Sequence, residues 1–382
     1  MKRGLPVVYL TVFIDLVGFG LILPQLPYYA ERFGATGVWV GAILTAYSAA
    51  QLVGASVLGR LSDRVGRRPV LLMSLAGSAA SFLLSGLAGS LFVLLTARAL
   101  AGLFGGSIAA AQAVIADVTT QRERARYMGL LGASIGLGFV LGPALGSGLA
   151  RFGFGAAAFS ASLLAAANLL YAFLRLPETR SAAERRHVHS RVDWSNLLDA
   201  LRHPSIGRLL AATFLCTLAF VAMEATFALL GEARFGLTAG RLGLVFAYVG
   251  VVMVIVQGGL VGRLALRFGE RAVATTGTLL MAASLAALPL ASSLAAAAGV
   301  LAGLAAGQGL TTPMLSTLLS RATDADEQGG TLGLGQSLAA AARAVGPIGA
   351  GWLYDRATGA PYAAGAALMV VAALLVGTGR TD

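Results

Sequence analysis

Apolar runs long enough to form helices recur along the whole chain, and short polar or basic segments separate them. A helix that crosses the hydrocarbon core of a bilayer needs roughly 20 apolar residues. The pattern therefore predicts an all-α membrane protein with twelve transmembrane helices. These predicted spans cover approximately residues 6–27, 38–59, 70–88, 91–116, 127–150, 156–174, 208–230, 239–262, 272–290, 293–320, 328–353 and 361–378.

Composition strengthens this interpretation. Of the 382 residues, 57% are hydrophobic and only 12% are charged, whereas a soluble chain carries about 25% charged residues. So few charged side chains cannot cover a water-exposed surface. The composition excludes a soluble enzyme, a secreted module and a DNA-binding domain, and it favours a protein whose outer surface contacts the lipid bilayer.

The net charge of +11 does not indicate a nucleic-acid partner, because the arginines lie in short clusters between apolar runs. With the amino terminus placed inside, 21 Lys and Arg residues fall on the cytoplasmic side and 5 on the outer side. This positive-inside bias predicts a multi-pass protein of the cell (inner) membrane with both termini in the cytoplasm.

The two halves of the chain resemble each other at an offset close to 203 residues. Arg32-Phe33-Gly34 recurs as Arg234-Phe235-Gly236, and Gly142-Pro143 recurs as Gly346-Pro347. An ordered series of such matches predicts two pseudo-symmetric six-helix bundles with the same orientation. Parallel repeats of this kind place a binding site between the halves near the middle of the membrane.

We expect the bundles to cover residues 1–175 and 208–382, with a cytoplasmic linker at 176–207. A short interfacial helix around Trp194 is an expected feature of this linker. The three histidines, His187, His189 and His203, all fall in it, and no Cys or further His cluster accompanies them. A solvated linker therefore explains them better than a metal site, and no metal or cofactor is expected.

The segment Gly59–Arg68 has the spacing Gly-x-x-x-Asp-Arg-x-Gly-Arg-Arg and joins the second and third predicted spans. Glycine allows a tight turn where helices approach closely, and arginines can pair with acids across this side of the protein. Any short cytoplasmic loop is basic, so the spacing is what distinguishes the segment. With it the chain resembles the major facilitator superfamily, whose loop signature it matches at nearly every position.

This resemblance implies the major facilitator fold and a cytoplasmic charge network that controls opening, formed by Asp63, Arg67 and Asp117. The residues that we expect to form this cytoplasmic gate are Gly59, Asp63, Arg64, Gly66, Arg67, Arg68 and Asp117.

A second motif in the fifth predicted span consists of Gly138, Gly142, Pro143 and Gly146. Its glycines form a small-residue stripe that lets another helix pack backbone to backbone, and Pro143 permits a bend. The motif is similar to the signature of twelve-helix drug:proton antiporters, which implies a seal between the halves. From the residues alone, a purely structural contact is an equally good interpretation.

Three further segments, 15–27, 115–117 and 123–126, are similar to the tetracycline-efflux branch of that family. The chain departs from tetracycline exporters at Ser81 and Met281, where they have acidic residues, and near Met253, where they have a histidine. This departure puts tetracycline as the cargo in question.

Four ionisable residues lie well within predicted spans: Asp15, Arg98, Glu224 and Arg343. Each costs roughly 2.5–3.5 kcal/mol on insertion scales, so each is expected to face a cavity or a partner. Burial disfavours a charged carboxylate and a nearby arginine favours it, so a carboxylate between these influences can take up and release a proton. Asp15 and Arg343 have structural ion pairing or capping as an alternative role.

The resemblance implies a role in proton coupling for Arg98, which lies four residues before Gly102. Because the acids of tetracycline exporters are missing here, we expect Glu224 to take over part of their role. Polar and aromatic residues on central spans are candidates for a substrate cavity, with ordinary helix packing as the alternative. They are Tyr47, Gln51, Gln112, Phe220, Phe227, Tyr248, Gln257, Gln308 and Gln336.

Together these features predict a monomeric secondary transporter that exports drugs or other small amphipathic molecules in exchange for protons by alternating access. The rival within this class is a proton-coupled transporter of a metabolite such as a sugar or an amino acid. No Walker-type phosphate loop supports ATP hydrolysis. A membrane-embedded enzyme is a less favoured alternative, because it would need clustered catalytic residues and the histidines all lie in the linker. A sensor is also less favoured, because it would need an appended soluble domain and no polar stretch here is long enough for one.

Overall fold

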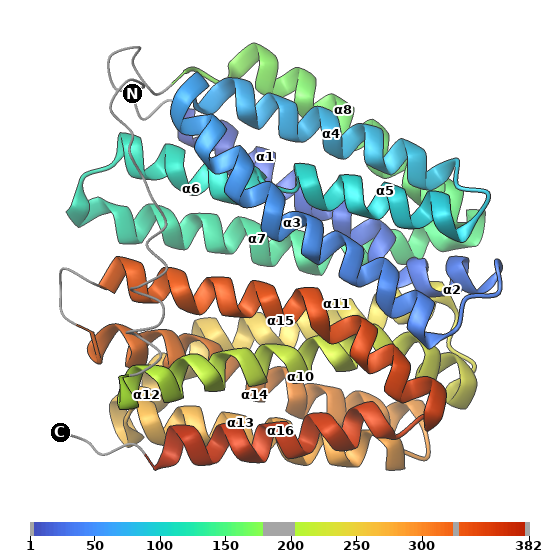
Figure 1. The fold of residues 1–382 in the computed structure, drawn as a ribbon, viewed down its shortest axis with the longest axis vertical. Coiled ribbons are helices and arrows are strands. Elements are labelled where there is room, and N and C mark those ends of the chain that lie inside the picture. The colour runs from blue at the N-terminus through green and yellow to red at the C-terminus, as the bar shows by residue number, and fades with distance from the viewer. Residues whose placement is uncertain (1–3, 179–202, 324–327, 379–382) are drawn as a thin grey trace. The chain divides into compact units, whose positions relative to one another are not determined.

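The computed structural model describes residues 4–178, 203–323 and 328–378, which in these ranges form helices and no β-strand (Figure 1). Each predicted span consists mostly of helix. The N-terminal half contains α1 (Leu5–Ile22), η2 (Leu23–Gln25), α2 (Leu26–Glu31), α3 (Gly37–Val65), α4 (Arg67–Gly86), α5 (Leu91–Phe104), α6 (Ser107–Val118), α7 (Gln121–Leu149), η3 (Ala150–Phe152) and α8 (Phe154–Arg175).

The C-terminal half repeats this order of long helices. It contains α10 (Pro204–Phe235), α11 (Ala239–Ile255), a π-helical turn η5 (Val256–Leu260), α12 (Val261–Phe268), α13 (Glu270–Ala287), η6 (Leu288–Leu290), α14 (Leu294–Arg321), α15 (Gln328–Arg356) and α16 (Ala360–Gly377). The predicted helix around Trp194, together with His187 and His189, lies outside the described residues.

Ten helical segments among the described residues are long and apolar enough to cross a membrane. The predicted span 91–116 is not one continuous helix, because α5 ends at Gly105 and α6 begins after Gly106. Each glycine is about 1 kcal/mol less favourable than alanine within a helix, so two in succession weaken the helix at this point. The other predicted span outside the ten is α15, so the number twelve stays a prediction.

The chain divides into two compact units. Residues 1–35, 46–190 and 237–247 form the first unit, and residues 36–45, 191–236 and 248–382 form the second. In the first unit α1 packs against α7 and α8, and α4 packs against α8 (Figure 1). In the second unit α13 packs against α14 and α16, and α10 packs against α15 and α16.

This division differs from the predicted halves in two short segments. Residues 36–45, which contain the first turns of α3, belong to the second unit, and residues 237–247 at the beginning of α11 belong to the first. Both beginnings contain glycines that lie against a helix of the unit they join. Gly41 lies against the backbone of Pro347 and Ile348, and Gly243 lies against Pro143.

The internal repeat is visible in the backbone. Gly66 (φ +111°) and Gly269 (φ +83°) make the turns before α4 and α13, and both have the left-handed backbone that favours glycine. Ser90 and Ser293 cap α5 and α14, and each hydroxyl accepts a hydrogen bond from an amide three residues later. Equivalent turns and caps confirm that the two halves share one local pattern.

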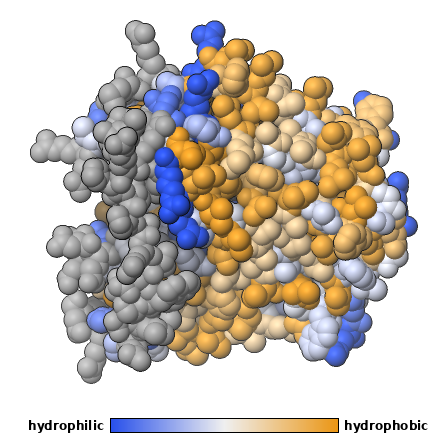
Figure 2. Space-filling model, turned by 45° about the horizontal axis from the view of Figure 1, so that its top comes forward, coloured by the Kyte–Doolittle hydropathy of each residue, from blue (hydrophilic) through white to orange (hydrophobic). Residues whose placement is uncertain are grey.

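Large apolar side chains lie on the outside of this protein as well as inside it. Figure 2 shows hydrophobic residues covering most of the face drawn. Phe92, Leu163 and Leu266 are among the strongly exposed ones. Contiguous apolar surface on this scale is unfavourable in water and typical of contact with lipid.

Candidate functional site

The Gly59–Arg68 motif lies at the junction of α3 and α4. Helix α3 runs to Val65, Gly66 alone makes the turn, and α4 begins at Arg67. Of the two glycines in the motif, Gly66 thus makes the expected turn and Gly59 does not. Gly59 lies inside α3, and a Cβ added there would meet nothing within 4 Å.

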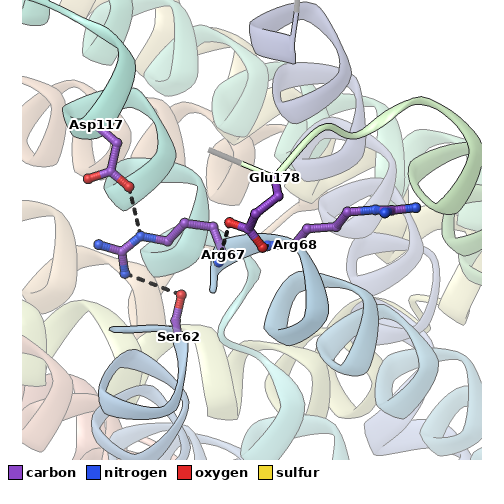
Figure 3. A network of polar contacts seen from close by, with 5 residues as sticks. All are labelled: Ser62, Arg67, Arg68, Asp117 and Glu178. Atoms are coloured by element: carbon purple, nitrogen blue, oxygen red, sulfur yellow. Dashed lines mark hydrogen bonds and ion pairs between the residues drawn. The ribbon is translucent and has the colours of Figure 1, made fainter. Parts of the chain in front are cut away.

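Arg67 is the centre of a polar network at this junction (Figure 3). Its Nε donates a hydrogen bond to Oδ2 of Asp117 at 2.9 Å, and its Nη1 donates to Oγ of Ser62 at 3.2 Å. Arg67 is buried and Asp117 is partly exposed at the end of α6. A charge-assisted pair of this kind is stronger than a neutral hydrogen bond, so it ties the start of α4 to the end of α6.

Glu178 is a member of this network that the sequence did not indicate (Figure 3). Its Oε1 accepts a hydrogen bond from the backbone amide of Arg67 at 3.0 Å, and its Oε2 accepts one from Arg68 at 3.3 Å. The first amides of a helix have no partner within the helix, and negative charge is favourable there. The one sequence signal for it is an acid directly after Pro177, just beyond the end of α8.

The other basic residues of the motif point elsewhere. Nη2 of Arg68 donates to the carbonyl oxygen of Phe173 at 2.7 Å, and its guanidinium lies 5.5 Å from the centre of the Phe173 ring. Arg64 is exposed on α3. The side chain of Asp63 lies outside the described part of the structure, so its place in the gate stays a prediction.

Asp15 of α1 is a buried acid inside a membrane-spanning segment, 9% exposed. The hydroxyl of Ser107, the first residue of α6, donates a hydrogen bond to its Oδ2 at 2.5 Å. The interruption at Gly105 and Gly106 thus places a helix N-terminus against the carboxylate, where the helix dipole favours negative charge.

Arg98 of α5 is 1% exposed. Its guanidinium lies 5.4 Å from the ring centre of Phe19 and 4.7 Å from that of Tyr47. Its three nitrogens have no hydrogen-bond partner among the described residues. Phe19 follows Asp15 by one turn of α1, so Asp15 and the aromatic partner of Arg98 share a face of that helix.

Two candidate cavity residues lie beside Arg98. Nε2 of Gln51 donates to the hydroxyl of Tyr47 and to the carbonyl oxygen of Gly105, both at 3.2 Å. The structure therefore brings Arg98, Tyr47 and Gln51 together near the end of α5. Gly102 permits this approach, because a Cβ there would overlap the backbone of Tyr47.

Glu224 and Arg343 are brought together in the second unit. They lie on α10 and α15, which pack against each other, and their charges interact. Both side chains are partly buried. A carboxylate and a guanidinium thus lie on two helices that pack against each other, and their role in coupling stays a prediction.

The glycine stripe of α7 packs against α1. A Cβ on Gly138 would lie 2.5 Å from Cβ of Leu16, one on Gly142 would lie 2.7 Å from Cα of Gly20, and one on Gly146 would lie 2.6 Å from the Leu21 oxygen. This confirms the expected backbone-to-backbone approach. The motif also lies close to the start of α11, where a Cβ on Gly243 would lie 2.6 Å from the backbone oxygen of Pro143. The role as a seal stays a prediction.

The remaining cavity candidates differ in exposure. Gln112, Tyr248, Gln257 and Gln336 are exposed, and Phe220 and Gln308 are partly buried. Phe227 is fully buried, which fits the packing alternative. Gln257 lies in the π-helical turn η5, a local distortion that the apolar pattern did not indicate and that is frequent at functional sites.

A family model described as the Major Facilitator Superfamily matches residues 8–265 and 235–378. The chain belongs to the major facilitator superfamily. Together with its ten apolar helices, this makes the chain a multi-pass membrane protein of a family that transports small molecules.

Within the superfamily the chain is similar to tetracycline resistance proteins. It is 35% identical to the class G protein of Vibrio anguillarum over 366 residues, which are 94% of the chain and 92% of that protein. It is 31% identical to the class B protein of Escherichia coli, with 91% and 88% covered.

Solved structures of the superfamily have the same fold. The crystal structure of the human organic anion transporter MFSD10 (TETRAN) has a TM-score of 0.74 and 28% identity and covers 98% of this chain and 99% of that one. An inward-facing, occupied structure of a bacterial homolog of the human lysosomal transporter Spinster has a TM-score of 0.78, with 97% and 95% covered. At 15% identity it supports the fold alone.

Proposed function

We propose that this protein exports small amphipathic molecules from the cytoplasm in exchange for protons, by alternating access between two six-helix halves of a twelve-span chain. Its relatives carry the names of tetracycline resistance proteins and, over 68% of the chain at 29% identity, of a multidrug resistance protein of Bacillus subtilis. These names support drug efflux across the cell membrane, and the distribution of Lys and Arg supports a cytoplasmic location of both termini.

The single observation that carries the proton-coupled mechanism is the environment of Asp15. Its carboxylate is buried in a membrane span and accepts a hydrogen bond from Ser107, and no ion pair of Asp15 is found within the described ranges. Burial in the membrane span favours the protonated form of this carboxylate, whereas the hydroxyl donor and the helix N-terminus favour the ionised form. Asp15 is therefore our candidate for the group that carries the proton.

Arg98 and the Glu224–Arg343 pair complete the proposed coupling set. The guanidinium of Arg98 lies over the ring of Phe19, and Phe19 shares a face of α1 with Asp15. Movement of one charge through 100 mV supplies about 2.3 kcal/mol, enough to drive useful accumulation of a cargo. The proposed coupling set thus contains one carboxylate and one guanidinium from each unit.

The proposal does not depend on the acids that tetracycline exporters have. Ser81 is buried, and its hydroxyl donates to the carbonyl oxygen of Gly77 within α4. Met281 is fully buried in α13, beside Gly307. Neither side chain can carry a proton through a transport cycle, so coupling has to rest on the residues named above.

Inverted membrane vesicles that contain the protein test the proposal. Toxic compounds are first screened for resistance in cells with and without the protein, and uptake of a compound that passes is then driven by a pH gradient. We expect Asp15→Asn and Glu224→Gln each to abolish gradient-driven uptake because each removes an ionisable carboxylate.

Glu232→Gln is the matched control, because Glu232 lies two turns further along α10, is exposed and loses the same charge. It should transport as the wild type does. Unchanged transport in both Asp15→Asn and Glu224→Gln would remove these acids from the mechanism.

A further inference from the structure

The second unit contains a hollow of about 860 Å³ at the end where α10 and α13 begin and α14 and α16 end. We call it the basic hollow, because His203, Arg208, Arg271 and Arg321 line it, with Glu270 as the one acid among its described lining residues. It lies outside the coupling set, and transport by alternating access assigns it no role.

Two of these arginines keep their charge uncompensated by any carboxylate in the described residues. Glu270 pairs with Arg321 at 2.7 Å. Within the described ranges, Arg208 donates only to backbone oxygens, those of Pro204 at 2.7 Å and Thr378 at 3.4 Å. Nε and Nη1 of Arg271 are buried atoms that have no hydrogen-bond partner among the described residues. Buried donors without partners are costly, so the hollow offers binding capacity for an anion.

The first unit shows what occupies the equivalent place. There, both carboxylate oxygens of Glu178 accept the first amides of α4, those of Arg67 and Arg68. The repeat aligns Arg67 and Arg68 with Glu270 and Arg271 at the start of α13. The N-cap residue of α13 is Gly269, which has no side chain that could accept a hydrogen bond from the first amides of the helix. The first unit thus fills this position with an oxyanion, whereas in the part of the second unit that the structure describes the basic hollow lies there.

The surroundings of the hollow are apolar on their outer side. Phe268, which lines it, is 56% exposed, and Leu318 and Leu375 also line it. A small inorganic anion gains nothing from such neighbours, whereas an amphipathic ligand places its acyl chains against them. The Lys and Arg distribution predicts this end to be cytoplasmic, the side where anionic lipids attract basic segments.

We propose that the basic hollow binds the phosphate of an anionic phospholipid headgroup. Arg208 and Arg271 supply the charge-assisted hydrogen bonds, the first amides of α13 add the positive end of a helix, and Phe268 contacts the upper acyl chain. The bound lipid would hold the ends of α10, α13, α14 and α16 together.

Native mass spectrometry of the purified full-length protein tests this proposal. The protein in detergent is titrated with phosphatidylglycerol, with phosphatidylcholine and with inorganic phosphate. We expect retention of phosphatidylglycerol and not of the other two. Arg271→Gln should lower the apparent affinity for phosphatidylglycerol about tenfold, the factor expected when one charge-assisted contact is lost.

Arg263→Gln is the matched control, because Arg263 is exposed on α12 at the same end, loses the same charge and does not line the hollow. Arg208→Gln is the second variant should Arg271→Gln fail to fold. Equal weakening by Arg263→Gln, equal retention of phosphatidylcholine, or equal binding of inorganic phosphate would each overturn the assignment.

Discussion

At the scale of single residues, Arg98 is a charged side chain whose burial costs free energy and whose guanidinium makes specific contacts with two aromatic rings. A guanidinium whose nitrogens have no partner among the described residues is unfavourable inside a protein, yet Arg98 is 1% exposed. The rings of Phe19 and Tyr47 supply the compensation that the structure shows. A desolvated contact between a cation and an aromatic ring contributes about 2 kcal/mol, and the planar guanidinium can in addition stack on the ring.

Arg98→Lys keeps the charge and removes the planar group. We expect pH-gradient-driven transport to fall about tenfold or more, because an ammonium cannot stack on both rings. Transport in inverted vesicles, with thermal unfolding as a check of folding, measures the effect. Arg151→Lys is the control, because Arg151 also stacks on a ring, that of Phe152, but is exposed. Wild-type transport by Arg98→Lys would contradict a role for the stacked geometry.

At the scale of elements, the glycines of α7 fall into two groups. Gly138, Gly142 and Gly146 lie against α1, whereas a Cβ on Gly148 of the same helix would meet nothing within 4 Å. Hydropathy identified α7 as a span, and the spacing of four identified the packed face. The partner helix, α1, was visible only in the structure.

Gly142→Ala should destabilise the protein, because its Cβ would meet the backbone of Gly20 on α1. Overpacking of this kind costs about 1–3 kcal/mol. Gly148→Ala should leave stability unchanged or raise it, since alanine is favoured by about 1 kcal/mol over glycine within a helix. Thermal unfolding in detergent compares the two variants. Equal stability of Gly142→Ala and the wild type would contradict the close backbone packing of α7 against α1.

At the scale of the whole molecule, α3 is shared between the two units. Its first turns belong to the second unit, where Oδ1 and Oδ2 of Asp355 accept the amides of Gly37 at 2.7 Å and Val38 at 2.9 Å. Nearby, the amide of Ile348 donates to Oγ1 of Thr45 at 3.2 Å. If alternating access moves the halves, this beginning of α3 has to leave α15 during each cycle.

A reversible crosslink tests that requirement. In a Cys216→Ala background, Thr45→Cys combined with Ile348→Cys should form a disulfide on oxidation, because these residues are in hydrogen-bond contact. We expect the crosslink to stop turnover and a reductant to restore it. Each single-cysteine variant should transport under oxidising conditions. Full transport by the crosslinked protein would contradict a separation of α3 from α15.

The sequence by itself determined the helical segments, the family and the internal repeat. Hydropathy runs, loop spacing and paired motifs are local properties, so a single chain displays them without its fold. It also singled out Asp15, Arg98, Glu224 and Arg343, because an ionisable residue inside an apolar run is conspicuous. It missed the interruption at Gly105 and Gly106, since two glycines within an apolar run do not change its hydropathy.

Only the tertiary structure decided the partners of these residues. Ser107 binds Asp15 across 92 positions, Glu178 binds the amide of Arg67 across 111, and Asp355 binds Gly37 across 318. The basic hollow likewise combines residues of five helices. Such contacts arise from the packing of helices far apart along the chain, and no local pattern of polar and apolar positions records which helices become neighbours.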